Sequence, residues 1–297
     1  MIAPAVFWPN ALGCAFFIAG MWMYRREVFV PASWPSAGVL ALGPVFVASA
    51  LAAFAGEHFT IAKSLAAMVP KFMPARLFIA YFVGVAHLCA ALSLVARRCV
   101  RWSTLLLGIM FALFVLLLHF PGALRNPGVR IAWIVTVRET TFSLGALSFF
   151  ATVIRDRSPR PATVIAQVAR VWSALVLIYY GIDQLFHPQY SPGVPDTKPT
   201  SQWGLVYATG GLLIAFGIMM LVRKYAVTGA KKTGLLMLLL TAILYLPQSF
   251  LAHGVSDQIN ALNFVFDTLL FSGTMLAIAR AIAVTEAPAD AAARAAG

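Results

Sequence analysis

Long apolar runs, separated by short polar turns, make up almost the whole chain. A run of about 18 or more mostly apolar residues predicts a transmembrane helix, because the helix satisfies its own backbone amides and lipid offers them no partner. The pattern predicts nine such helices, at residues 6–24, 35–56, 75–96, 103–120, 131–154, 165–186, 202–222, 233–251 and 261–283. The turns are too short for a separate soluble domain. We therefore expect an all-α, polytopic transmembrane helix bundle.

Composition agrees with a membrane location. The chain has 61% hydrophobic and 11% charged residues, whereas soluble domains have roughly 45–50% and about 25%. Its formal net charge of +12 is then expected to set the topology and to contact anionic lipids. Nucleic acid is not an expected partner.

Positive charges follow every second predicted helix and predict the topology. They are Arg25, Arg26, Arg97, Arg98, Arg101, Arg155, Arg157, Arg160, Arg223, Lys224, Lys231, Lys232 and, in the last helix, Arg280. With nine spans they all lie on one side, which the positive-inside rule makes cytoplasmic. Lys63, Lys71 and Arg76 are the exception. We expect a bacterial inner-membrane protein with its N-terminus outside and its C-terminus in the cytoplasm. Because its charges follow its apolar run, the first helix is expected to be an anchor and not a cleaved signal.

The chain also repeats itself at a period of about one half of its length. The matching pairs are Gly56 and Gly181, 125 positions apart, Gly84 and Gly210 and Pro121 and Pro247, 126 apart, and Glu139 and Asp267, 128 apart. Each unit has four helices, so both units enter the membrane from the same side and form parallel repeats. The expected division is an N-terminal helix and basic turn at 1–34, repeats at 35–160 and 161–284, and a disordered tail at 285–297.

Short motifs follow one another in the first repeat in a definite order. They are "FAGEHF", "MVPKFMPA", "GVAHLCAALSL", "ARRCVRW", "LLLHFP" and "RETTFSLGALSFF"; the second repeat, from "YYGIDQLFHP" to "FDTLLFSGTMLAIA", matches more loosely. This order resembles the DoxX-like family of four-helix membrane proteins. The resemblance implies membrane redox systems, including quinone-linked ones, while more distant relatives act on sterol-like lipids or in assembly. Many members are expected to have a Glu where this chain has His87 and Leu213, which puts chemistry that needs that carboxylate in doubt.

Two acidic residues lie deep in predicted helices. Glu139 is about eight residues, or on the order of 12 Å, into its helix, and Asp267 has the equivalent place in the second repeat. A charge there costs about 2.5–3.5 kcal/mol and needs a partner or a watery cavity. The alternative to a functional role is a structural one, in which Glu139 pairs with Arg138 and Asp267 bonds to Asn263 and Thr268.

The other candidates lie near the predicted outer ends of the helices. In the first repeat Glu57 and His58 end one helix and His119 ends another. A quinone needs an apolar slot with one or two hydrogen-bonding side chains at headgroup level. His58 and His119 would bind its oxygens, with Glu57 and Glu139 as proton acceptors or orienting groups. The full predicted ligand-binding set is Glu57, His58, His119, Glu139, Asp183, His187, His253 and Asp267.

Haem, flavin and metal are not expected. Cys14, Cys89 and Cys99 form no C-x-x-C pair, and no two histidines have the spacing that places two ligands on one helix face. His87 lies near mid-membrane, away from the other histidines, which disfavours a bis-histidine haem. The chain has no Gly-rich phosphate loop.

The favoured function is a membrane subunit of a redox system that binds a quinone or similar lipophilic molecule near the outer face. It would be at most a quinone-linked oxidoreductase subunit, with electrons supplied by a partner protein. A non-enzymatic anchor or assembly scaffold and a small-solute transporter are the alternatives, and a homo-oligomer is also open. The sequence leaves the ligand, the partner and the activity of the second repeat open.

Overall fold

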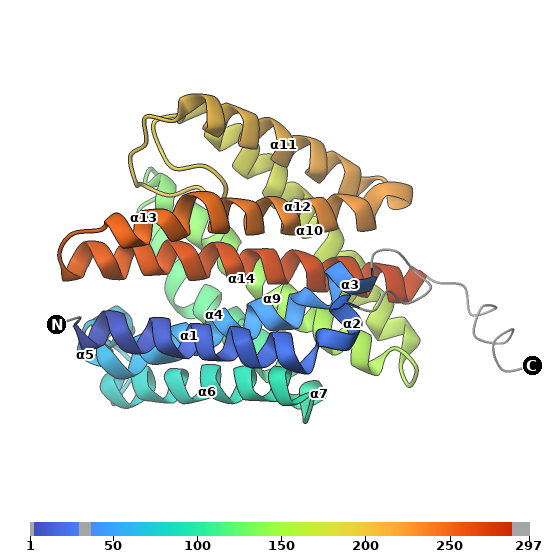
Figure 1. The fold of residues 1–297 in the computed structure, drawn as a ribbon, viewed down its shortest axis with the longest axis horizontal. Helices are drawn as coiled ribbons and strands as arrows, with labels where there is room; N and C mark the ends of the chain where they lie inside the picture. Colours follow the sequence, from blue (N-terminus) through green and yellow to red (C-terminus); the bar gives the residue numbers. More distant parts are fainter. Residues whose placement is uncertain (1–2, 30–36, 287–297) are drawn as a thin grey trace, which may run out of the picture.

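The protein is an all-α helical bundle, described here by a computed structural model for residues 3–29 and 37–286 (Figure 1). In these residues no strand forms, and a single bridge pairs Tyr190 with Pro199. The predicted fold class is confirmed. The expected tail lies, from residue 287 on, outside the described residues. So do residues 30–36, on which the end of the expected basic turn and the start of the helix expected at 35–56 fall.

The described elements follow one another in a simple order. They are α1 (Pro4–Met23), α2 (Arg25–Phe29), α3 (Ala37–Leu40), α4 (Leu42–Thr60), α5 (Ala62–Met68), α6 (Arg76–Ala96), α7 (Val100–Phe114), the π-helical segment η1 (Val115–His119), α8 (Phe120–Arg125), α9 (Arg130–Ile154), α10 (Pro159–Phe186), α11 (Trp203–Leu221), the 3-10 turn η2 (Arg223–Tyr225), α12 (Ala226–Leu240), the π-helical segment η3 (Thr241–Tyr245), α13 (Leu246–Leu251) and α14 (Val255–Glu286).

Eight helical stretches of the described chain are long and apolar enough to cross a membrane. They correspond to eight of the nine predicted spans and support a multi-pass membrane protein. The remaining predicted span, α9, is a helix of 25 residues, or about 37 Å at 1.5 Å per residue. It carries Arg130, Arg138 and Glu139 and is not among the eight. Contacts with α7, α10 and α14 cover α9.

A proline explains the matching ends of two helices. Pro121 and Pro247 have no backbone N–H, and each ring would clash with the carbonyl four residues earlier in a regular helix. The helix widens to a π turn just before each proline, at Val115–His119 and at Thr241–Tyr245. Short helices, α8 and α13, then continue from the prolines.

Helices α4 and α14 lie at the centre of the bundle (Figure 1). They approach closely where glycines meet, since a Cβ on Gly273 would lie 2.8 Å from the Gly43 carbonyl oxygen. Outward-facing side chains on the spans are large and apolar, including Phe78, Phe82 and Leu106. That distribution is expected for helices that face lipid.

The predicted basic turns gather at one end of the bundle. Tyr24, Arg97, Thr152 and Arg280 line one groove, which brings together the ends of α1, α6, α9 and α14. Tyr24 Oη donates to the Leu94 carbonyl at 2.9 Å, and Arg97 forms a 2.5 Å ion pair with Glu27. The opposite end carries α5, α13 and residues 187–202, and is called the loop end below (Figure 1).

The same contacts occur twice in the bundle. Ser143 Oγ donates to the Gly108 carbonyl at 2.8 Å, and Ser272 Oγ donates to the Gly234 carbonyl at 2.7 Å. A Cβ on Gly108 or on Gly234 would meet Leu147 or Leu276, respectively. These contacts put α9 and α14 in register at a separation of 129 positions, one more than the 128 inferred from the sequence. Arg138, not Glu139, therefore corresponds to Asp267.

Candidate functional site

His58 and His119 line the same apolar cavity at the loop end of the first half. Its volume is about 380 Å³, within the ~300–1,000 Å³ typical of small-molecule sites. Helices α4, α5, α6 and α7 and the segment η1 form its walls, which are otherwise apolar: Leu65, Met68, Val69, Met73, Ile79, Ala80, Phe82, Val83, Met110, Leu113, Phe114, Leu117 and Leu118. The structure thus brings together two of the predicted residues that are 61 positions apart in the chain.

One hydrogen bond fixes the ring of His58. Its Nδ1 lies 2.8 Å from the Ala80 carbonyl oxygen. Because a carbonyl oxygen only accepts, Nδ1 must donate, and the neutral ring then keeps Nε2 as an acceptor. Nε2 is the atom of His58 that remains for a ligand. A hydroxyl group would match it.

A second apolar cavity continues from the first between α6 and α7. It has a volume of about 340 Å³ and shares Phe82, Met110 and Leu113 with the first cavity. Phe82 is 59% and Leu113 is 45% exposed, so the shared rim opens on the lipid-facing side. The two cavities thus adjoin along a shared wall: one contains the two histidines, and the other is apolar.

His87 lies behind the cavity and has no partner for its ring. Its side chain is buried, and neither ring nitrogen has a hydrogen-bond partner in the described residues. Its ring centroid is 5.5 Å from that of His58, 6.4 Å from that of Phe54 and 5.9 Å from that of Phe111. An unsatisfied buried group of this kind costs about 1–3 kcal/mol. The sequence placed His87 away from the other histidines, and that expectation is wrong, because its ring contacts the ring of His58.

Arg138 links the two predicted intramembrane acids. It forms an ion pair with Asp267 at 2.8 Å and with Glu139 at 3.6 Å. The three side chains are 19%, 21% and 12% exposed. The sequence suggested Glu139 with Arg138 but not the bond from Arg138 to Asp267. The signal was present, since an Arg within a predicted span needs a buried acidic partner.

Glu57 faces away from the cavity, toward α14. With the amide of Asn263 oriented to satisfy its hydrogen bonds, the amide nitrogen donates to the two Glu57 carboxylate oxygens at 2.7 and 3.0 Å. Asp267 is close enough for its charge to act on Glu57. Asn263 therefore pairs with Glu57, and not with Asp267 as the structural alternative supposed.

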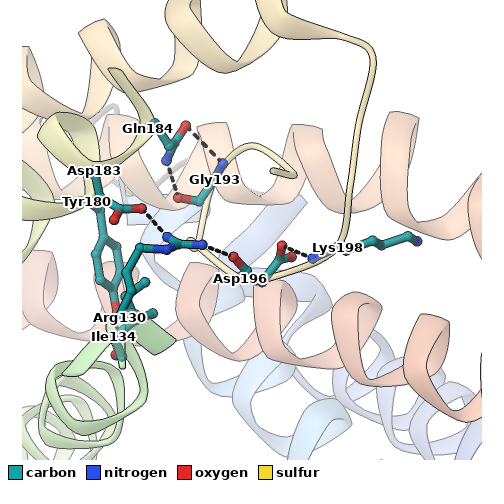
Figure 2. A network of polar contacts seen from close by, with 8 residues as sticks. All are labelled: Arg130, Ile134, Tyr180, Asp183, Gln184, Gly193, Asp196 and Lys198. Carbon is teal, nitrogen blue, oxygen red and sulfur yellow. Dashed lines mark hydrogen bonds and ion pairs between the residues drawn. The ribbon is translucent and has the colours of Figure 1, made fainter. Parts of the chain in front are cut away.

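In the second half, Asp183 belongs to a polar network that holds the 187–202 loop (Figure 2). Arg130 donates to Asp183 Oδ2 at 2.5 Å and to the Asp196 carbonyl oxygen, and its guanidinium lies 4.5 Å from the ring centroid of Tyr190. Asp196 Oδ1 accepts from the Lys198 backbone N–H at 2.7 Å. Asp183 is thus occupied by Arg130 and is not a ligand group facing a cavity.

Burial is the main influence on Asp196. It raises the pKa of this loop carboxyl to about 7, against the opposing effects of Lys198 and Arg130. Oδ2 of Asp196 is buried without a hydrogen-bond partner among the described residues. The group therefore titrates near neutral pH.

The last two predicted residues lie in the loops of the second half. His187 follows α10, with its ring centroid 6.3 Å from that of Tyr190. His253 lines a polar groove together with Lys198, Gln248 and Asp257. Neither lines the cavity of the first half. Across the described residues, no group of three His, Cys, Asp or Glu side chains could hold a metal ion.

Comparison with protein-family models, with curated proteins and with solved structures finds no match for the chain. The resemblance to the DoxX-like family therefore stays a prediction. The eight apolar helices of the described residues by themselves indicate a multi-pass membrane protein.

Proposed function

We propose that the protein binds a quinone-class lipophile in the cavity of the first half and serves as the membrane subunit of a redox system. The observation that carries the proposal is the placement of His58 and His119, from separate helices, in one otherwise apolar cavity. Polar groups in such a cavity orient a ligand, while the walls provide affinity. The apolar continuation past Met110 accommodates a hydrocarbon tail.

Each histidine has a distinct role in this proposal. His58, held by Ala80, presents Nε2 and accepts a hydrogen bond from a ring hydroxyl. His119 binds the second ring oxygen from the π-helical segment η1. A bound quinone supplies two-electron, two-proton redox chemistry, and a partner protein exchanges the electrons. His58 holds the proton of the reduced ring's hydroxyl in place.

We further propose that the loop end faces the periplasm and that the protein lies in a bacterial inner membrane. The basic ends of α1, α6, α9 and α14 gather at the opposite end, and the positive-inside rule favours the cytoplasm for that end. The cavity would then open into the outer leaflet. As in the DoxX-like proteins that the motifs resemble, the partner would be a redox protein.

Mass spectrometry of bound lipophiles tests the proposal. The protein is purified in mild detergent, extracted and compared with a His58→Ala/His119→Ala variant. The matched control is His187→Ala/His253→Ala, which removes two histidines outside the cavity. We expect about one quinone per wild-type and control chain and at least a tenfold loss in the cavity variant. No quinone in the wild type, or equal retention in all three, would overturn the proposal.

A transporter remains the second candidate because of the Arg138 cluster. Its three side chains are partly exposed although they lie within the bundle, and Arg138 Nε has no partner among the described residues. A transporter would lose uptake in both Glu139→Gln and Asp267→Asn but keep it in the His58→Ala/His119→Ala variant. A redox subunit would lose quinone binding in the His58→Ala/His119→Ala variant and keep it in Glu139→Gln and in Asp267→Asn.

A further inference from the structure

The cavity of the first half has a counterpart position in the second half. Gly84 packs on the helix that bears His58, since its Cβ would lie 2.7 Å from His58 Cβ; a Cβ on Gly210 would lie 3.2 Å from Gln184 Cβ. Gly84 and Gly210 are 126 positions apart, as are His58 and Gln184. Gln184 thus stands where the first half has His58.

The second histidine also has a counterpart. The π-helical segments Val115–His119 and Thr241–Tyr245 are 126 positions apart and each precedes a proline by the same interval. His119 and Tyr245 end these segments. Tyr245 therefore stands where the first half has His119.

In the second half both counterparts bind one piece of the chain itself. Gln184 Nε2 donates to the Gly193 carbonyl oxygen at 2.7 Å, which Figure 2 shows, and Tyr245 Oη donates to the Pro192 carbonyl oxygen. A Cβ on Gly193, whose φ is +96°, would lie 2.8 Å from Leu240 Cδ1. Leu240 is the counterpart of Phe114, which lines the cavity in the first half.

This piece of chain is buried although it has no regular structure. All six residues from Ser191 to Asp196 are buried, and we call this segment the plug. The corresponding connection in the first half behaves differently, because none of residues 69–75 is buried and Phe72 is 74% exposed. The plug therefore fills this position in the second half, whereas the first half has a cavity there.

We infer that the plug occupies in the second half the place that a ligand occupies in the first, so that the chain binds one ligand whose two oxygens take the positions of the Pro192 and Gly193 carbonyls. This deepens the proposed function and rests on it. The oxygen at His58 carries hydrogen, because Nε2 accepts. The bound form is a quinol, with one hydroxyl on His58 and the second oxygen on His119.

Titration of the purified protein with a decyl-substituted benzoquinone and with its quinol tests the ligand class. We expect the wild type to bind one equivalent of quinol per chain, at least tenfold more tightly than it binds the benzoquinone. Tighter binding of the oxidised form would overturn the assignment of the hydroxyl to His58. If neither the quinone nor the quinol binds to the wild type, the proposed function is wrong, and so is this inference.

Gly193→Leu tests the plug, because a side chain there meets Leu240. In a background with Cys14, Cys89 and Cys99 changed to Ala, Val194→Cys reports the position of the plug through reaction with a maleimide. We expect the maleimide to label Val194→Cys slowly in this background and at least tenfold faster when Gly193→Leu is added. The Gly193→Leu variant should also bind a second equivalent of quinol per chain. Faster labelling with only one equivalent would overturn the inference while leaving the proposed function intact.

A second variant decides the result if Gly193→Leu does not displace the plug. Replacing Ser191–Asp196 with six Gly and Ser residues removes the filling side chains and keeps the loop length. Two equivalents of quinol per chain support the inference. One equivalent, with the wild-type affinity, overturns it.

Discussion

Arg138 of α9 and Asp267 of α14 meet at 2.8 Å and are 129 positions apart. The same separation relates Phe142 to Phe271, whose ring centroids are 6.1 Å apart. When residues that correspond in two repeats contact each other, the axis that relates the repeats passes between them. We infer that a pseudo-twofold axis runs between α9 and α14. Corresponding positions on the two sides of the axis thus carry opposite charges, Arg138 and Asp267, and the two side chains form an ion pair.

Removing the cation of this pair is expected to destabilise the protein. Arg138→Gln leaves Asp267 and Glu139 without their cationic partner, which typically costs about 3 kcal/mol. Thermal unfolding in detergent measures the loss. Arg138→Gln/Asp267→Asn should lose at least ~1 kcal/mol less than the sum of the two single variants, because contacting residues couple. Additive losses would show that the ion pair does not contribute.

Close contact across the axis makes Gly145 sensitive to substitution. A Cβ on Gly145 would lie 2.5 Å from Thr274 Cγ2, so Gly145→Ala should cost about 1–3 kcal/mol by overpacking. Gly211→Ala in α11 is the control, because nothing lies within 4 Å of that position. The control should be neutral or stabilised by up to ~1 kcal/mol. Thr274→Ala should rescue Gly145→Ala; failure of the rescue would contradict this packing.

Met110 lines both cavities of the first half and should control the choice of tail length. Met110→Trp fills the shared rim, so a decyl-substituted benzoquinol should lose at least tenfold in affinity. A tailless methyl-substituted quinol should lose less than threefold, because its ring needs only the compartment of His58 and His119. Competition binding in detergent measures both. Equal losses would place the tail elsewhere.

The plug should loosen as pH rises toward neutrality. Burial raises the pKa of Asp196 from 3.8 to about 7, so the seated plug keeps its proton at a pH where the released plug has lost it. Stability of the seated state is therefore greatest below about pH 4 and falls as pH rises to about 7. The charged and titratable groups facing Asp196 are Lys198, Arg130, Arg138 and Tyr245.

Hydrogen exchange at the backbone amides of Ser191, Gly193, Val194 and Asp196, corrected for intrinsic rates, measures this effect between pH 5 and pH 8. We expect the protection factors to fall with rising pH in the wild type. In Asp196→Asn, which keeps the shape but cannot ionise, they should stay constant. Protection factors that rise with pH in the wild type would contradict the predicted loosening of the plug.

Much of the fold follows from local pattern. Apolar runs located the nine long helical stretches of residues 3–29 and 37–286, and the spacing of Pro121 and Pro247 located two matching helix ends. The basic turns predicted which helix ends meet, as the groove of Tyr24, Arg97 and Arg280 shows. The register between the repeats was wrong by one residue in the last helix, and the contacts of Gly84 and Gly210 change it by one in the helix of His58 as well, from 125 to 126 positions. Small insertions in a loop shift a sequence comparison, whereas packing at Gly108 and Gly234 fixes the register directly.

The sequence by itself determined the residue types of the candidate site and the place of most of them along their helices, because the place depends only on the helix rise and on where an apolar run begins and ends. Tertiary structure decided which side chains face one another. His58 and Glu57 are neighbours, yet His58 lines the cavity and Glu57 faces Asn263 on α14. The plug is another such outcome, because whether the connection 187–202 enters the bundle depends on the space between helices far apart in sequence.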